Sequence, residues 1–290
     1  QEVQVGFAKK GVFEEVQDFN GNGEIDDEDR AYFRKHRAPL TRLNIKYQRM
    51  MMGAAAYASN HHIGVGFSSS QYIQGVPYKF DENGKVTNAD SAHLYGGLIG
   101  HEMGHVMDIG DRLYPETSNN LMTAITGTML NENSPYFDSF KKVYEKVTSN
   151  TIGLSTDRTV VLNMLWQPYL AYEDNITYEM LFTDVDADLT NDSYFAKLNR
   201  AYREMSEEER VNGDRDQWLI RLTSKVVGKD LTDFYEAHGI IANETTLAYV
   251  SKFPKETKKI QYINDEARRQ RIAGTADMEE GTTLSASFAD

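Results

Sequence analysis

The sequence contains no cysteine, and this absence limits the chemistry open to the fold. Neither disulfide bonds nor zinc–thiolate sites can form, so zinc-finger folds are excluded. Basic residues are few beside acidic ones: 31 Lys and Arg stand against 44 Asp and Glu, a formal net charge of −13. Nucleic acids and anionic membranes are bound by clustered positive charge. We therefore expect neither as the main partner.

Long apolar runs and targeting signals are also missing. No run reaches the roughly 18 residues of a membrane-spanning helix, so we expect no membrane insertion. The chain begins with Gln1 rather than methionine and has no signal-peptide pattern. We interpret it as a piece excised from a longer polypeptide. Its 290 residues are enough for one large core or two lobes.

Helical patterns dominate the rest of the chain. Residues 40–59 follow Pro39 and are rich in helix formers, so they predict a helix. Residues 62–80 combine β-branched and aromatic residues with Gly, Ser and Pro, which indicates short strands. Further helices are predicted at 91–108, 117–131, 134–148, 158–173, 193–205, 214–227, 229–238 and 260–272. The predicted fold class is α+β, mostly α, with a small β element and a helical C-terminal lobe.

Three segments are expected along the chain. Residues 1–60 form an N-terminal helical segment, residues 61–277 form the main core, and residues 278–290 read as a linker or the start of a missing neighbour.

The sequence HEMGH, residues 101–105, is the main candidate for a catalytic site. On a helix, residues four apart differ by about 40°, so His101 and His105 project from one face and can reach one metal ion. Glu102 lies about 100° round from His101, where it can address a metal-bound water without ligating the metal. This arrangement predicts a zinc peptidase with Glu102 as the general base.

Two carboxylates compete for the third ligand position. Asp111 lies six residues after His105, a spacing used where the ligand follows a tight turn, but such turns need glycine where this chain has Asp108. Glu116 follows Pro115 and begins a predicted helix, whose first turn can complete a two-His, one-Glu site. We favour Glu116, with Asn119 and Asn120 able to orient the histidines through hydrogen bonds.

HEMGH followed by ETSNN, residues 116–120, resembles the HExGH…ExxNN signature of the enhancin-like gluzincins, metallopeptidase family sixty. The similarity extends to YFAKLNRAYREM, VVGKDLTDFYEAHG and YINDEAR, and so covers most of residues 40–275. One departure is Asp108, where many members have Gln. The resemblance implies a gluzincin (thermolysin-like) catalytic domain, with His101, His105 and Glu116 as zinc ligands and Glu102 as general base. It also implies secreted or surface virulence enzymes of host-associated bacteria that attack mucins and other O-glycoproteins.

The polar segment DFNGNGEIDDED, residues 18–29, predicts a second metal site. It matches an EF-hand-type calcium loop, with a glycine at the sharp turn and Ile25 placed to anchor the loop in the core. The expected role of Ca²⁺ is structural. The predicted ligands are Asp18, Asn20, Asn22, Glu24 through its carbonyl, Asp26 and Asp29.

Three functions remain to be compared. The first is a zinc endopeptidase, a monomeric catalytic domain of a larger protein, that cleaves O-glycosylated (mucin-type) proteins beside a glycosylated Ser or Thr. The second is a zinc endopeptidase indifferent to sugar, and the third is a glycan-binding adhesin module with a vestigial zinc site. By fold analogy, the strand around Gly64–Phe67 is a candidate sheet edge for pairing with substrate.

Overall fold

The computed structural model describes residues 16–36, 43–50, 53–59, 61–67, 69, 79–85, 87–88, 96–129, 140–173 and 194–274. The chain forms two compact units. The first contains residues 1–38, 109–113 and 135–290, and the second contains residues 39–108 and 114–134. Compactness does not establish independent folding, so the segment boundaries expected at residues 60 and 277 stay predictions. The expected linker, 278–290, lies outside the described residues.

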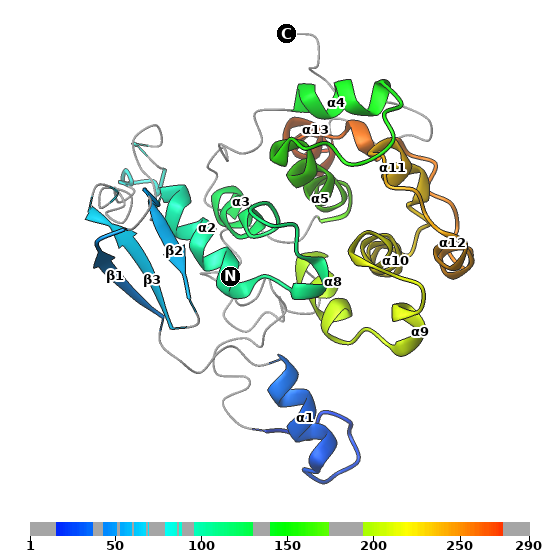
Figure 1. Cartoon of the computed structure of the whole chain (residues 1–290), viewed down its shortest axis with the longest axis horizontal. Helices are drawn as coiled ribbons and strands as arrows, with labels where there is room; N and C mark the ends of the chain where they lie inside the picture. Colours follow the sequence, from blue (N-terminus) through cyan, green and yellow to red (C-terminus); the bar gives the residue numbers. More distant parts are fainter. Residues whose placement is uncertain are drawn as a thin grey trace. The chain divides into compact units, whose positions relative to one another are not determined.

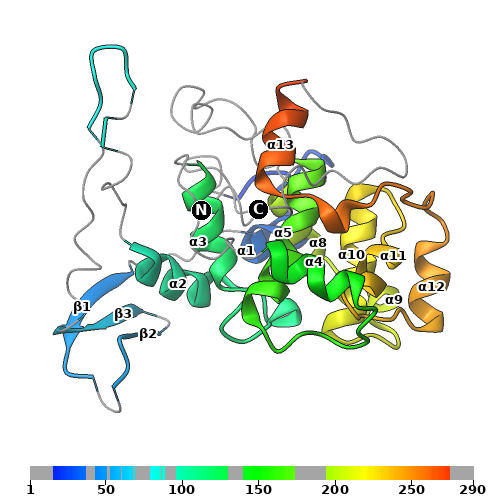
Figure 2. The same cartoon turned by 90° about the horizontal axis from the view of Figure 1, so that it is seen from above.

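The second unit is built on a three-stranded sheet with the strand order β1-β3-β2. β1 pairs parallel with β3, so that Ile45 lies beside Ile63, and β2 pairs antiparallel with the other side of β3. Helix α2 lies between this sheet and α3 (Figures 1 and 2). The bounds are β1 Asn44–Gln48, β2 Ala56–Ala58, β3 His62–Gly66, α2 Gly96–Met107 and α3 Asn120–Met129.

The core of the second unit is one face of β3 packed on α2. Ile63 and Val65 are two residues apart, so both point to the same face, and both are completely buried. They pack with Ile99 of α2, while Leu98 and Met103 border the cluster. At about 100° per residue, Ile99 lies about 160° round the helix from His101 and about 120° from His105. Packing α2 against the sheet therefore turns both histidines away from the sheet.

The helix predicted at residues 40–59 is wrong, because β1 and β2 lie within it. NIKYQ alternates polar and apolar residues, a period of two that suits a strand. Pairing with β3 outweighs the helix propensity of the segment. The expectation that β3 is a sheet edge is also wrong: among the described strands it is central, and the edge strand packed on α2 is β2.

The first unit is helical, and most of its helices lie where the sequence predicts them. α5 is buried nearly all round, including Trp166, and packs against α4, α8, α13 and η3 (Figure 1). None of the described helices is long and apolar enough to cross a membrane. The bounds are α1 Asp27–His36, η2 Gly110–Arg112, α4 Phe140–Thr148, α5 Arg158–Tyr172, α8 Tyr194–Arg203, α9 Glu207–Arg210, α10 Arg215–Val227, α11 Thr232–Ala237, α12 Glu244–Val250, η3 Ile260–Tyr262 and α13 Asp265–Ile272.

Two short helices, α9 and α12, are not predicted by apolar periodicity. Each begins at a polar cap: Ser206 and Glu209 form a reciprocal capping box, and Asn243 accepts from the backbone N–H of Thr246. A serine followed three residues later by glutamate is a recognisable start signal. Capping residues rather than periodicity carry the information for such short helices.

Candidate metal centre and catalytic site

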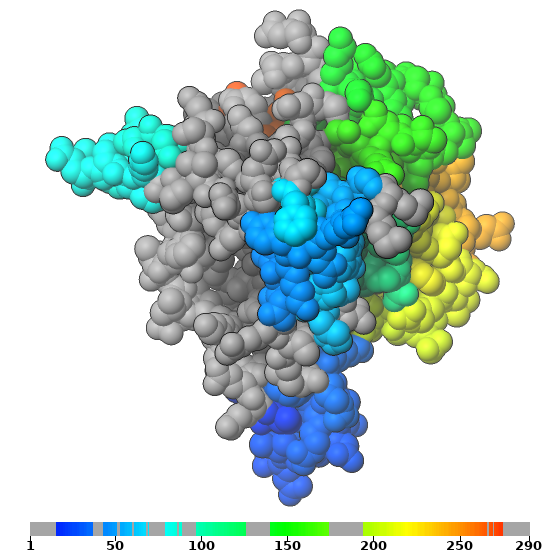
Figure 3. All heavy atoms as spheres, turned by 60° about the vertical axis from the view of Figure 1, so that its left-hand side comes forward, coloured from blue at the N-terminus to red at the C-terminus, as the bar shows by residue number. Residues whose placement is uncertain are grey.

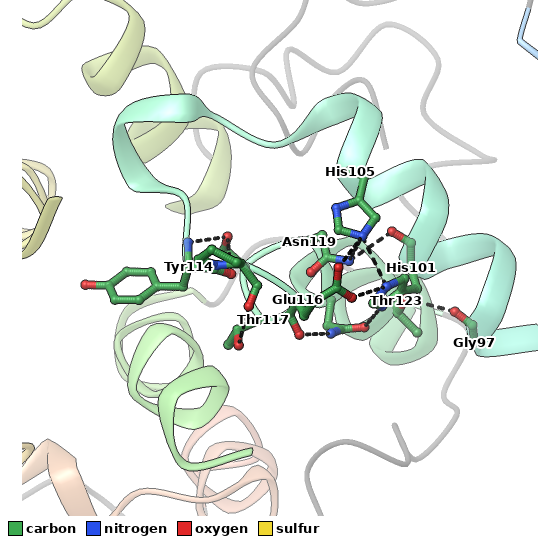
Figure 4. Close-up of polar contacts among 11 residues, drawn as sticks. Gly97, His101, His105, Tyr114, Glu116, Thr117, Asn119 and Thr123 are labelled. Carbon is green, nitrogen blue, oxygen red and sulfur yellow. Dashed lines mark hydrogen bonds and ion pairs between the residues drawn. The ribbon is translucent and has the colours of Figure 1, made fainter. Parts of the chain in front are cut away.

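His101 and His105 point from α2 toward Glu116, which lies in the segment before α3 (Figure 4). The Nε2 atoms of the two histidines are 3.2 Å apart. Glu116 Oε2 lies 3.0 Å from His101 Nε2, and Glu116 Oε1 lies 3.5 Å from His105 Nε2. These three side chains form a group whose ligand atoms all lie within 4.8 Å of one another.

The spacing of these donor atoms fits zinc. With Zn–N and Zn–O bonds of about 2.0–2.1 Å, two ligands at tetrahedral corners are about 3.3 Å apart. The two nitrogens are 3.2 Å apart, and they lie 3.0 and 3.5 Å from one carboxylate oxygen each, distances that bracket this value. Two imidazoles and one carboxylate also form a known donor set of catalytic zinc sites, which keep the fourth corner open. The residues present therefore fit a zinc ion.

Glu116 has an unusual backbone conformation for a non-glycine residue. Its φ is 58°, in the left-handed region. The sequence placed Glu116 in the first turn of a helix at 117–131, but α3 begins only at Asn120. Glu116 lies instead in a turn in which the N–H groups of Thr117 and Ser118 both donate to the carbonyl of Tyr114.

Asp111, the competing carboxylate, has a different partner. It lies in η2, and its Oδ2 accepts from Arg210 at 3.2 Å. The group formed by the two histidines contains Glu116 and not Asp111.

The two asparagines of ETSNN both contact the histidine helix. His101 Nδ1 lies 2.8 Å from Asn120 Oδ1, so the Nδ1–H can donate to this oxygen and leave the Nε2 lone pair available to a metal. The Asn119 amide donates to the carbonyl of His101 at 3.2 Å and also lies 3.2 Å from His105 Nε2. His105 Nε2 has one lone pair, so it can accept this hydrogen bond or bind a metal, but not both. The contact of Asn119 with the His101 carbonyl is compatible with either state.

Glu102 is buried beside these groups but is not one of the three converging side chains; it is only 5% exposed. Burial raises the pKa of its carboxyl group, the neighbouring His101 and His105 lower it, and Glu116 raises it. A raised pKa suits a group that must take up a proton and return it near neutral pH. Burial and a raised pKa are compatible with the general-base role, which stays a prediction.

Two glycines four residues apart allow α3 and its preceding turn to approach α2 closely. A Cβ atom added at Gly104 would lie 1.9 Å from the carbonyl oxygen of Asn119. One added at Gly100 would lie 2.6 Å from the side-chain oxygen Thr123 Oγ1 and 3.2 Å from Thr123 Cα, so its closest contact is with a side chain and its backbone contact is far less severe. Only a residue without Cβ at 104 permits this backbone contact, which brings the segment carrying Glu116 to the histidines.

We therefore expect Gly104→Ala to weaken metal binding and to destabilise the fold by about 1–3 kcal/mol, a typical value for overpacking. Gly100→Ala is the matched control, because a side chain can move where a backbone carbonyl cannot. Zinc titration and thermal denaturation of both variants would test this. Equal effects of the two substitutions would contradict the prediction.

The predicted calcium loop lies at the exposed surface near α1, dark blue at the bottom of Figure 3. Asp18 accepts from the N–H groups of Gly21, Asn22 and Gly23, which shapes the turn. Asp29 is buried and accepts from the N–H groups of Phe19, Asn20 and Asp26. The prediction that Ile25 anchors the loop in the core is wrong, because its side chain is 50% exposed.

The arrangement of the other loop side chains does not itself support calcium. The amide nitrogens of Asn20 and Asn22 point at Asp26 Oδ2, whereas a calcium ion would require their oxygens. Among the described residues, no second set of three His, Asp or Glu side chains brings its ligand atoms as close together as the histidine group does. The calcium ligands remain a prediction.

The site is that of a metallopeptidase domain: two histidines on α2, the buried Glu102 beside them, and Glu116 from the following segment as the third metal ligand. The chain belongs to the family "Peptidase M60, enhancin and enhancin-like", whose sequence profile matches residues 27–239. This confirms the family resemblance seen in HEMGH and ETSNN, and with it the mostly helical gluzincin-type fold. No protein with a curated description matches the chain.

Solved structures share this fold. A conserved protein of unknown function from Bacillus anthracis is 17% identical with a TM-score of 0.59, and the match covers 91% of this chain and 46% of that one. The M60 catalytic domain of Clostridium perfringens ZmpC, in complex with the sialyl T antigen, is 24% identical with a TM-score of 0.51, covering 77% and 39%. A C. perfringens ZmpB structure with CBM32 and M60 domains is 24% identical with a TM-score of 0.52, covering 76% and 20%. This chain thus spans less than half the length of these solved chains.

Proposed function

We propose that this chain is a zinc endopeptidase that hydrolyses O-glycosylated, mucin-type proteins next to a glycosylated Ser or Thr. The observation that carries the zinc peptidase is the convergence of His101 Nε2 and His105 Nε2, 3.2 Å apart, on the Glu116 carboxylate, whose Oε2 lies 3.0 Å from the first nitrogen and whose Oε1 lies 3.5 Å from the second. The preference for glycosylated substrate rests on membership of the M60 family and on the neighbouring ZmpC domain, which was solved with the sialyl T antigen.

The side chains divide the work of peptide hydrolysis. His101, His105 and Glu116 would hold the zinc ion, and Asn120 fixes the tautomer and ring orientation of His101 through the 2.8 Å contact at Nδ1. When bound, the zinc ion polarises the scissile carbonyl and makes water more acidic. Glu102 takes the proton from the attacking water and returns it to the leaving amine. Its burial keeps this proton transfer away from bulk solvent.

The sugar preference predicts a difference in catalysis between glycosylated and bare substrates. Contacts with a sugar remote from the scissile bond help to hold the reacting geometry, so removing the sugar should lower the rate of the reaction itself. A pocket built for sugar hydroxyls leaves unpaired polar groups when they are missing, a loss of up to about 10⁴-fold. We expect cleavage of a mucin-type glycopeptide and little or none of its unglycosylated twin, measured by mass spectrometry.

The Glu102→Ala variant, purified in the same way, is the control for contaminating proteases. Equal rates on the two peptides would reject sugar recognition and leave a sugar-indifferent zinc endopeptidase. Absence of cleavage on both peptides, with sugar binding retained, would favour the adhesin module. The complete set of two histidines and two glutamates argues against that alternative.

The net charge of −13 also predicts that short or unsialylated glycans are preferred over sialylated ones, more so at low salt.

We further propose that residues 18–29 bind one structural Ca²⁺ ion. This proposal is supported by the spacing of the oxygen-bearing residues and by the turn that Asp18 shapes. Binding would require the Asn20 and Asn22 amides to turn their oxygens inward. An ion that binds only the folded state stabilises it by about 2.7 kcal/mol at one hundred times its dissociation constant.

The expected result is a melting temperature that rises with added calcium in the wild type and in Asp27→Ala, but not in Asp18→Ala. Asp27 is the matched control because it lies in the same loop at a position that supplies no ligand. A calcium-independent melting curve of the wild type would reject this site.

We propose that the protein is secreted or lies on the bacterial cell surface, as part of a larger multidomain virulence enzyme. An extracellular calcium site would fit this location.

A further inference from the structure

The hydroxyl group of Ser118 links the turn that carries Glu116 to the end of the histidine helix. Ser118 Oγ lies 2.5 Å from Oδ2 of Asp108, the residue directly after α2. The same oxygen accepts from the N–H of Tyr114 at 3.0 Å, which closes the turn from its other end. Ser118 is only 1% exposed, so water competes little for these hydrogen bonds.

The hydroxyl proton has two possible acceptors, Asp108 Oδ2 and the carbonyl of Tyr114 at 3.3 Å. The carbonyl already accepts from the N–H groups of Thr117 and Ser118. A carboxylate accepts more strongly than a carbonyl and gives shorter hydrogen bonds. We therefore assign the proton to the bond between Ser118 and Asp108.

The turn needs such a restraint because Glu116 has a left-handed backbone. For a residue with a side chain this conformation costs about 1–2 kcal/mol, so the segment would otherwise relax toward ordinary φ values. A change of φ at Glu116 would swing its carboxylate away from His101 and His105. The Asn120 amide holds one end of the segment by donating to the Glu116 carbonyl at 3.2 Å. The bond between Ser118 and Asp108 holds it from the other side.

We propose that Asp108 and Ser118 are positioning residues for the third metal ligand. Their hydrogen bond fixes the turn from Tyr114 to Ser118 against the end of α2, three residues beyond His105, and so fixes Glu116 relative to both histidines. This inference rests on the proposed zinc peptidase. It also gives a role to Asp108, whose short carboxylate reaches the Ser118 hydroxyl group.

The test compares Ser118→Ala with Ser118→Thr, which keeps the hydroxyl group, and with Ser251→Ala, which removes an exposed serine hydroxyl bonded to the carbonyl of Ala248. Three measurements apply: zinc affinity by competition with a chelating dye, the visible spectrum of the cobalt-substituted protein, and kcat and KM on the glycopeptide. Loss of a hydrogen bond that orients a ligand lowers metal affinity by about 10–100-fold. We expect this loss in Ser118→Ala, together with a changed cobalt spectrum and a fall in kcat at nearly constant KM. Ser251→Ala should behave like the wild type, and Ser118→Thr should regain most of the zinc affinity lost in Ser118→Ala because it keeps the hydroxyl group.

Wild-type zinc affinity and cobalt spectrum in Ser118→Ala would overturn the positioning role while leaving the zinc peptidase intact. A wild-type chain that binds no zinc would overturn both. Should Ser118→Ala fail to fold, Asp108→Asn tests the same bond with less disturbance, because the amide keeps the shape and weakens the acceptor. An unchanged zinc affinity in that variant would likewise overturn the proposal.

Discussion

Replacement of Glu102 by alanine should leave one zinc ion bound per chain and remove nearly all hydrolysis. Glu102 is buried next to the metal-binding group but is not one of its three converging side chains. Its loss removes the acceptor for the proton of the attacking water, and such general-base catalysis contributes about 10²–10⁴-fold. Metal analysis by mass spectrometry and cleavage rates on the glycopeptide would measure the two effects separately.

Glu102→Gln is the matched variant, since it keeps the shape of the side chain and removes only its basicity. Both variants should bind zinc as the wild type does. A loss of stoichiometric zinc in either would show that Glu102 is a ligand, and residual turnover near the wild-type rate would show that another group moves the proton.

Replacement of Glu116 by alanine should have the second large effect, a severe loss of zinc affinity. Glu116 brings one carboxylate oxygen to each histidine, at 3.0 and 3.5 Å. Removing a hydrogen bond to a ligand costs about 10–100-fold in affinity, so removing the ligand itself should cost roughly a hundredfold or more. Zinc titration in the presence of a competing chelator would measure the loss.

Asp111→Ala is the control for this prediction. Asp111 is a carboxylate close in sequence, and it is paired with Arg210. That variant should retain wild-type zinc affinity, with at most the small change in stability that follows loss of a partly exposed ion pair. If Asp111→Ala lost zinc and Glu116→Ala kept it, the donor group would have been assigned to the wrong carboxylate.

The sequence predicts the convergence of the two histidines because helix geometry determines it. Residues four apart on a helix share a face, so HEMGH alone indicates that His101 and His105 converge. The preference for Glu116 over Asp111 rests on a predicted helix start after Pro115, and this reason is only partly right. α3 begins later, at Asn120, and a left-handed turn rather than a helical one presents the carboxylate.

Other features depend on contacts between residues distant in sequence, and the local signal for them is weak or missing. Residues 40–59 contain good helix formers, yet β1 and β2 form there because β3 offers a partner on each side. The same pairing makes β3 central rather than an edge. Ile25 follows the calcium-loop pattern, but its side chain is 50% exposed among the residues that the structure describes. The bond between Asp108 and Ser118 likewise spans a turn whose course cannot be inferred from either residue.

Because Glu116 has a left-handed backbone, the stability of the metal-free fold and the binding of a metal favour different residues at this position. Glycine adopts a φ of 58° without strain. Glu116→Gly would therefore relieve about 1 kcal/mol of backbone strain in the metal-free fold, but it would also remove the third metal ligand. Directed evolution that selects heat resistance in a chelating buffer would therefore drift toward an inactive chain at this position. Selection in the presence of zinc would retain the glutamate, because the energy of metal binding then outweighs the strain. The composition of the buffer would thus decide which residue such an experiment recovers at position 116.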